Sequence, residues 1–288
     1  MKKWFLKDTG AAMLFLLPSV IGFALFYLVP FVMGVSYSFM NSSVERQFVG
    51  LDNYNELFAS DSFRKAASNT FIFTVVSVPL MLVISLGLAL VLNQSVYFRK
   101  WLRTAYVLPL VVPVASIILM WQILLDWNGS LNVWLQYFGF ERVDWMKTDA
   151  ARYVVIAVYL WKNVGYNIIL FLAGLQQIPQ DYYETACMEG AGRFRQFSSI
   201  TLVYLIPTMF FVVIMSIINS FKVFREAYLI AGDYPHDSIY MLQHYMNNMF
   251  MSLDIQKLTA AATLMAGCIM FIVIGLFIME RYFRQSVE

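Results

Sequence analysis

The chain has 288 residues, of which 60% are hydrophobic, 17% aromatic and only 13% charged. Soluble domains carry about 25% charged residues, so this composition excludes a soluble globular protein and indicates a membrane protein. The formal net charge of +2 gives no indication of nucleic-acid binding.

Six segments are long and apolar enough to cross a bilayer. A transmembrane helix needs about 20 residues with few or no charges, and five uncharged stretches meet this criterion. A sixth stretch, Tyr153 to Gln180, is apolar except for Lys162. All six are expected to be helices, because lipid offers no partner for an unpaired backbone amide. The predicted spans are approximately residues 10–32, 70–92, 104–125, 153–175, 202–221 and 260–279.

The six spans are predicted to form one all-α bundle over residues 1–288, since no repeat, low-complexity stretch or long linker divides the chain. A cleaved signal peptide is an alternative for the first span, but its apolar run exceeds the roughly 7 to 15 residues of such a segment. Prolines in or beside the spans permit kinks. They indicate either helices that bend around a moving pathway or the usual frequency of proline in membrane helices. These are Pro18, Pro30, Pro79, Pro109, Pro113 and Pro207.

Basic residues predict the orientation of the chain. Short loops rich in lysine and arginine stay in the cytoplasm. The tail before the first span and the short link between the second and third spans are both basic, and that link contains no acid. By alternation, the loop after the fourth span and the C-terminal end lie on the same side, so both termini are predicted to be cytoplasmic. The basic residues concerned are Lys2, Lys3, Lys7, Arg99, Lys100, Arg103, Arg281 and Arg284.

The stretch "YYETACMEGAGRFRQFSSITLVYLIP" interrupts the apolar pattern with charges and two glycines. Pro179 suits the first turn of a short helix, where its missing N–H costs nothing. The segment Gly190-Ala191-Gly192 supplies a residue that can adopt the left-handed conformation and end that helix. A second helix is predicted from about Arg193 into the fifth span. Residues 179–200 are therefore predicted to form a helix, a sharp turn and a helix on the cytoplasmic side.

The first of these two helices carries a stripe of mostly small residues. Tyr183, Ala186, Cys187 and Gly190 recur at i, i+3, i+4 and i+7, which places them on one face. Small residues allow another surface to approach closely, so we predict that this face docks on a partner. The alternative is a solvated loop with a glycine turn.

At these residues the chain resembles the permease subunits of binding-protein-dependent ATP-binding cassette (ABC) importers, in particular the sugar-type permeases. Their cytoplasmic signature reads Glu-Ala-Ala, three residues, Gly, nine residues, Ile, one residue, Leu-Pro. The similarity extends over nearly the whole chain, through "FVGLDNY", "WKNVGYNIILFLAGLQQIP" and "SFKVFREAYLI". In the last outer loop an acid expected after Phe224 is Arg225, and an expected Gly-Gly-Pro is replaced by "GDYP". The signature is matched at Glu184, Ala186, Gly190, Ile200 and Leu202, and the chain departs from it at Thr185 and Val203.

The resemblance implies a type I importer permease whose signature loop is a coupling helix, held in a cleft of a separate ATPase. It implies a polar contact from Glu184 and a turn at Gly190. The sequence contains no G-x-x-x-x-G-K-[ST] motif, so ATP and Mg are expected on two partner ATPase subunits, with no cofactor or metal in this chain. A second homologous permease, commonly an unlike chain, and an extracytoplasmic binding protein are the other implied partners. The predicted coupling residues are Tyr183, Glu184, Ala186, Cys187, Gly190 and Gly192.

Polar side chains in the spans mark a candidate substrate pathway. Lys162 costs about 3 kcal/mol at mid-membrane, so it is expected to face protein or water rather than lipid. Aromatic rings, amides and a cation together suit a sugar, although the same residues also suit helix packing and a subunit interface. The candidates are Trp121, Gln122, Lys162, Asn163, Tyr166, Asn167 and Asn219.

We therefore expect a subunit of an ATP-driven importer for a sugar, oligosaccharide or related polyol, located in a prokaryotic cell membrane. A secondary transporter driven by an ion gradient would require carboxylates inside the membrane, and none of the predicted spans contains one. A membrane enzyme would require clustered His, Asp or Glu. His236 and His244 lie in the last outer loop, and their spacing does not fit a recognised metal site.

Overall fold

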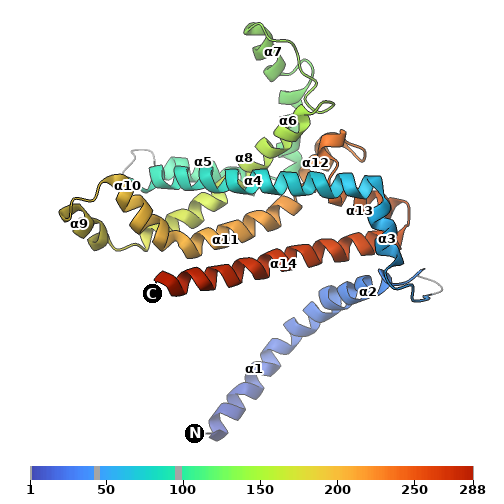
Figure 1. Cartoon of the computed structure of the whole chain (residues 1–288), viewed down its shortest axis with the longest axis horizontal. Helices are drawn as coiled ribbons and strands as arrows, with labels where there is room; N and C mark the ends of the chain where they lie inside the picture. The colour runs from blue at the N-terminus through green and yellow to red at the C-terminus, as the bar shows by residue number, and fades with distance from the viewer. Residues whose placement is uncertain (1, 42–45, 95–98, 288) are drawn as a thin grey trace. The chain divides into compact units, whose positions relative to one another are not determined.

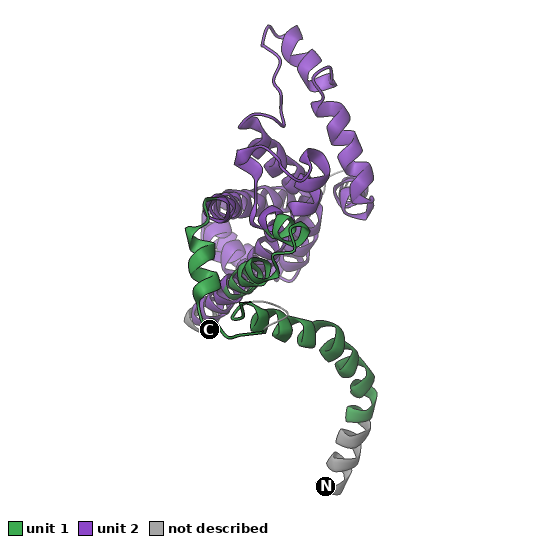
Figure 2. Cartoon of the chain, turned by 90° about the vertical axis from the view of Figure 1, so that its right-hand side faces the viewer, with its two compact units in different colours: residues 1–61, 246–267 green, residues 62–245, 268–288 purple. Residues whose placement is uncertain are grey.

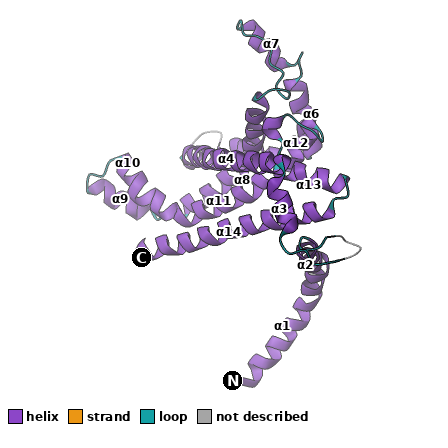
Figure 3. Cartoon of the chain, turned by 45° about the vertical axis from the view of Figure 1, so that its right-hand side comes forward, coloured by secondary structure: helices purple, strands orange, loops and turns teal. Residues whose placement is uncertain are grey.

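The computed structural model describes residues 2–41, 46–94 and 99–287, and these residues are predominantly helical (Figures 1 and 3). Extended pairing within them is confined to one isolated antiparallel bridge, between Met40 and Phe48. The chain divides into two compact units, one of residues 1–61 and 246–267 and the other of residues 62–245 and 268–288 (Figure 2). Residues 95–98 of the predicted basic link lie outside the described residues.

The first unit contains an N-terminal helix that is interrupted by a π-helical turn just before a proline. Helix α1 (Lys2–Phe23) runs into a π-helical turn (Ala24–Leu28) and then into α2 (Val29–Tyr37). Pro30 in the first turn of α2 has no N–H to donate to the preceding turn, and π turns and kinks commonly accompany such a loss.

Helix α3 (Asp52–Ala59) lies in the segment "FVGLDNY" and directly after it. Asn53 Nδ2 donates to the carbonyl oxygens of Ser38 and Met40, each at 2.9 Å. Tyr54 Oη lies 2.8 Å from Ser38 Oγ. These bonds satisfy carbonyls at the end of α2 and fix the chain's return toward α3.

The second unit is built around α8 (Ala150–Gln176), along which α5 (Arg99–Val111) and α11 (Leu202–Phe221) pack (Figure 1). Its core contains large buried side chains such as Phe73, Tyr159, Phe171 and Leu205. The remaining helices are α4 (Asp61–Asn93), α6 (Val114–Leu125), α7 (Ser130–Tyr137), α9 (Gln180–Met188), α10 (Arg193–Gln196) and α12 (Phe224–Ala231), with a 3-10 turn at Asp237–Ile239. Helices α13 (Leu242–Met251) and α14 (Ile255–Val287) complete the chain.

Six helical stretches are long and apolar enough to span a membrane, which confirms the predicted number. Within the described residues they are Ala12–Tyr37, Asp61–Asn93, Val114–Tyr137, Ala150–Gln176, Arg193–Ala231 and Ile255–Phe283.

The third span differs from the continuous helix predicted over residues 104–125. The structure ends α5 at Val111 and begins α6 at Val114, with Pro113 as the cap residue in an extended conformation (ψ 135°). Proline cannot donate a helical hydrogen bond, and it disfavours the helical conformation of the residue before it. These two effects explain the break.

Gly165 allows α5 and α8 to approach closely. A Cβ atom on this residue would lie 1.8 Å from the backbone oxygen of Tyr106 in α5. No side chain can move to relieve that overlap, so the two helices would have to separate. Small residues serve this purpose at helix crossings in membranes.

We expect Gly165→Ala to destabilise the protein by about 1–3 kcal/mol, the usual cost of overpacking. The matched control is Gly87→Ala in α4, where an added Cβ meets nothing within 4 Å. Thermal unfolding of the detergent-extracted protein, followed by size-exclusion chromatography, compares the two variants. An equal melting temperature for both would contradict the assigned close approach.

Candidate functional site

The loop after α8 forms a helix, a turn and a helix, as predicted. Pro179 precedes α9, and Gly190 adopts a left-handed conformation with φ +79°. The amide of Ala191 donates to the carbonyl of Ala186 at 2.8 Å, and the amide of Gly190 donates to the carbonyl of Cys187 at 3.0 Å. This pair of bonds is a Schellman motif, which satisfies the last carbonyls of a helix and favours glycine at the left-handed position.

Two tyrosines hold α9 against the start of α11. Tyr183 Oη lies 2.9 Å from Thr201 Oγ1, and the rings of Tyr182 and Tyr204 lie 5.3 Å apart. Thr201 belongs to a π-helical turn (Phe197–Thr201) that joins α10 to α11. These contacts attach the loop to the end of α11 that we predict to be cytoplasmic.

The predicted stripe does not form a single outward face. Tyr183 and Ala186 are half-buried, whereas Glu184 and Cys187 are exposed. The reason is the bond from Tyr183 to Thr201, which turns that edge of α9 toward its own chain. Gly192 is exposed and has an extended conformation (φ −67°, ψ 163°) that any residue can adopt.

Two large apolar side chains at the tip of the loop were missed in the sequence analysis. Met188 is 89% exposed and Phe194 is 82% exposed, one on each side of the Gly190 turn. Large apolar side chains exposed on a loop are typical of an interaction site. Their position on either side of a predicted helix-ending glycine is the signal that could have identified them.

A polar cavity of about 440 Å³ lies at the opposite end of α11, among α5, α8, α11 and α12. Four of the predicted pathway residues line it: Lys162, Asn163, Tyr166 and Asn219. Asn163 Nδ2 donates to the carbonyl of Tyr159, one helical turn earlier, at 2.8 Å. The cavity is also lined by residues that are not among those predicted from the sequence, namely Tyr159, Lys222, Arg225 and Glu226, together with Leu110, Met215 and Val223.

Lys162 forms an ion pair with Glu226 of α12 inside the protein. The side chains are 18% and 6% exposed, so the expectation that Lys162 avoids lipid is confirmed. The predicted spans themselves contain no carboxylate, but Glu226 lies just beyond the fifth, within the longer helical stretch Arg193–Ala231. The predicted fifth span ends at Phe221. A lysine inside a membrane implies a nearby acid, and this requirement is the signal that could have identified Glu226.

The other three predicted pathway residues lie outside the cavity lining. Asn167 is buried and donates to Ser216 Oγ at 3.2 Å, which joins α8 to α11. Trp121 packs edge-on against Trp161, with ring centroids 6.0 Å apart. Gln122 Nε2 donates to the carbonyl of Leu229 at 3.0 Å, so it holds the helix that carries Glu226. These contacts support the packing interpretation for the three residues.

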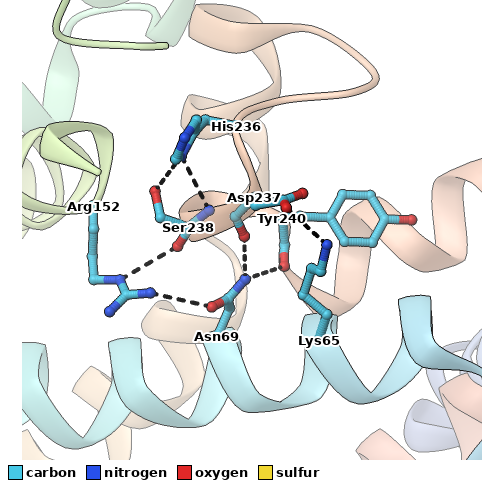
Figure 4. A network of polar contacts seen from close by, with 7 residues as sticks. All are labelled: Lys65, Asn69, Arg152, His236, Asp237, Ser238 and Tyr240. Atoms are coloured by element: carbon cyan, nitrogen blue, oxygen red, sulfur yellow. Dashed lines mark hydrogen bonds and ion pairs between the residues drawn. The ribbon is translucent and has the colours of Figure 1, made fainter. Parts of the chain in front are cut away.

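A network of polar contacts fixes the loop that follows α12 (Figure 4). Asn69 Nδ2 donates to the carbonyls of Asp237 at 2.6 Å and Tyr240 at 3.0 Å. Arg152 donates to the carbonyl of Ser238 and to Asn69 Oδ1, each at 3.4 Å. The loop is thus attached to both α4 and α8, which also restricts α12 on its C-terminal side.

Charge and burial near this loop shift two pKa values. The Lys65 ammonium, 2.9 Å from Asp237, lowers the pKa of that carboxyl below its usual value. Burial lowers the pKa of His244 to about 4, and its ring packs edge-on against Phe224 at 4.8 Å. The His244 imidazole is therefore neutral near pH 7, and its Nδ1 accepts from the amide of Met241.

Six helices long and apolar enough to span a membrane, a turn at one end of α11 and a cavity at the other are the architecture expected of a membrane transport protein. The family model for the binding-protein-dependent transport system inner membrane component matches residues 57–288. The chain therefore belongs to this family and is a transport subunit of the membrane.

Relatives and solved structures agree with that family. The probable ABC transporter permease YurN of Bacillus subtilis is 31% identical over 286 residues, 96% of each chain. The trehalose/maltose transport system permease MalF of Thermococcus litoralis is 33% identical over 80% of this chain and 79% of its own length. In a solved bacterial alginate ABC transporter in complex with an alginate pentasaccharide-bound periplasmic protein, one chain has a similar fold (TM-score 0.84, 24% identity, 96% of each chain). This likeness confirms the predicted permease fold.

Proposed function

We propose that the chain is one of two homologous membrane subunits of an ATP-driven importer for a sugar, oligosaccharide or related polyol. The observation that carries the proposal is the family match over residues 57–288. The names of relatives, such as the trehalose/maltose permease, support the solute class. In the cavity, the Tyr166 ring suits the apolar face of a sugar, while Asn163 and Asn219 suit its hydroxyl groups.

ATP hydrolysis belongs to separate subunits in this proposal. The sequence lacks the phosphate-binding motif, so ATP and Mg bind to two partner ATPases. The turn at Gly190 docks there, with Glu184, Cys187, Met188 and Phe194 exposed toward the partner. Both termini lie on this cytoplasmic side.

Helix α11 connects the docking turn to the cavity. Its 20 residues correspond to a length of about 30 Å, close to the thickness of the hydrocarbon core. Thr201, just before its first residue, bonds to Tyr183 of the docking loop, and Asn219 near its last residue lines the cavity. Closure of the ATPases would move this helix and open the cavity to the outer side, where a binding protein delivers the solute.

ATP-dependent uptake by the complete transporter in proteoliposomes tests the proposal. With the binding protein and a labelled mixture of neutral and anionic oligosaccharides outside and ATP inside, we expect uptake that stops when ATP is omitted, whatever ion gradient is imposed. Uptake driven by an ion gradient alone would contradict the proposal and favour a secondary transporter.

A further inference from the structure

The lining of the polar cavity is unbalanced in charge. Lys162, Lys222 and Arg225 are cationic, and Glu226 is the one acid among the lining residues. Glu226 pairs with Lys162, so its charge is already compensated. Within the described part of the chain, no carboxylate lies within ion-pair distance of Lys222 or Arg225. Two positive charges at the cavity therefore lack a counter-ion.

The position of Arg225 does not serve the stability of its own helix. It lies in the first turn of α12, where the positive end of the helix dipole disfavours a cation. Lys222, in contrast, follows the last residue of α11, where a cation is favourable. Arg225 is next to Glu226 in the sequence, but the Glu226 carboxylate pairs with Lys162 instead. A ligand at the cavity would explain a cation at this place.

Lys222 and Arg225 are exposed, and a neutral solute bound in the cavity would remove part of their water without replacing its interactions. Desolvation of an unpaired charge is costly, whereas pairing with an anion offsets that cost. The guanidinium of Arg225 offers the planar fork of donors that suits a carboxylate or phosphate, and Lys222 adds a point charge.

We propose that this cavity takes a carbohydrate that bears an anionic group, held by Arg225 and Lys222. The buried Lys162–Glu226 pair forms the adjoining wall, while Tyr166, Asn163 and Asn219 contact the neutral part of the sugar. This inference rests on the proposed function, carbohydrate uptake, and adds the charge of the solute.

Competition between matched solutes tests the inference. The complete transporter with its binding protein is reconstituted, energised with ATP and given an equimolar mixture. The mixture contains uronic acid oligosaccharides of two to four units, their methyl esters, and hexose monophosphates. The solutes that accumulate are identified by mass spectrometry. The methyl esters differ from the free acids mainly in charge, and the monophosphates separate a phosphate source from a carboxylate source.

We expect the free acids or the monophosphates to accumulate at least about tenfold over the esters, the effect of one charged hydrogen bond. Equal or preferred accumulation of the esters would overturn the inference. If none of these solutes accumulates but labelled maltotriose does in a parallel assay, the inference fails and the proposed function stands. If neither the mixture nor maltotriose accumulates although the binding protein stimulates ATP hydrolysis, the proposed function itself fails, and this inference fails with it.

The double variant Lys222→Gln/Arg225→Gln tests whether these two residues cause the preference for anionic solutes. We expect its preference for acids over esters to fall by about tenfold, because each lost contact involves a charged group. The matched control is Arg142→Gln/Lys147→Gln, which removes two cations outside the cavity and is expected to keep the wild-type preference. An unchanged preference in the cavity variant would overturn the assignment to Arg225 and Lys222, whatever the wild-type preference is.

Discussion

Replacement of Gly190 by valine is expected to reduce ATP-driven uptake by about 5- to 30-fold or more while the protein remains in the membrane. Gly190 has φ +79°, and left-handed backbone costs a residue with a side chain about 1–2 kcal/mol, more if it is β-branched. The Schellman bonds from Gly190 and Ala191 would then be lost, and Met188 and Phe194 would no longer flank the same turn. Uptake and membrane content are measured on the same preparation.

Two control variants distinguish the effect of the backbone conformation at Gly190 from the effect of added side-chain bulk. A Cβ at Gly190 meets no atom within 4 Å, so any defect arises from the backbone or from the docked partner. Gly190→Asn keeps a residue that tolerates the left-handed conformation and is expected to retain most activity. Gly192→Val adds the same bulk at an extended position and is also expected to be active. Full uptake by Gly190→Val would show that the loop does not couple ATP hydrolysis to transport.

Removing one member of the Lys162–Glu226 pair is the second change with a large expected effect. Both side chains are mostly buried, and breaking a buried pair leaves an uncompensated charge at a cost of about 3–5 kcal/mol. We expect Glu226→Gln or Lys162→Met alone to lower both the yield of extractable folded protein and uptake. Loss of Glu226 also removes its contact between α12 and α8.

The double variant Lys162→Met/Glu226→Gln completes the cycle. With neither charge present, most of the lost stability is expected to return, because replacing a buried pair with neutral groups is often close to neutral. The measurement is the interaction free energy from thermal unfolding of the four proteins. Additive losses in the double variant would mean that the two residues act independently and that the pair does not hold α12.

The sequence predicted the features that depend on local chemistry. Six apolar stretches, a helix after Pro179 and a turn at Gly190 follow from hydropathy, the missing proline N–H and the freedom of glycine at positive φ. The protein-facing position of Lys162 followed from the cost of a cation in lipid.

Features that depend on tertiary contacts were not accessible from one sequence. Glu226 is 64 residues from Lys162 along the chain, and its helix lies beyond the predicted end of the fifth span. Asn69 bonds to a carbonyl 168 residues away. The inward turn of Tyr183 depends on Thr201, which spacing within α9 cannot reveal. At Pro113 the sequence predicts a position that permits a kink, whereas the structure has a break between α5 and α6.

The composition of the complex purified through this chain tests the central claim most directly. The chain is tagged in its native membrane, extracted in mild detergent, and its copurifying subunits are identified and counted. We predict a second six-span permease and two ATPase subunits, with the ATPases lost when Glu184 and Gly190 are both replaced. Recovery of the chain alone, still transporting without ATP, would contradict the account.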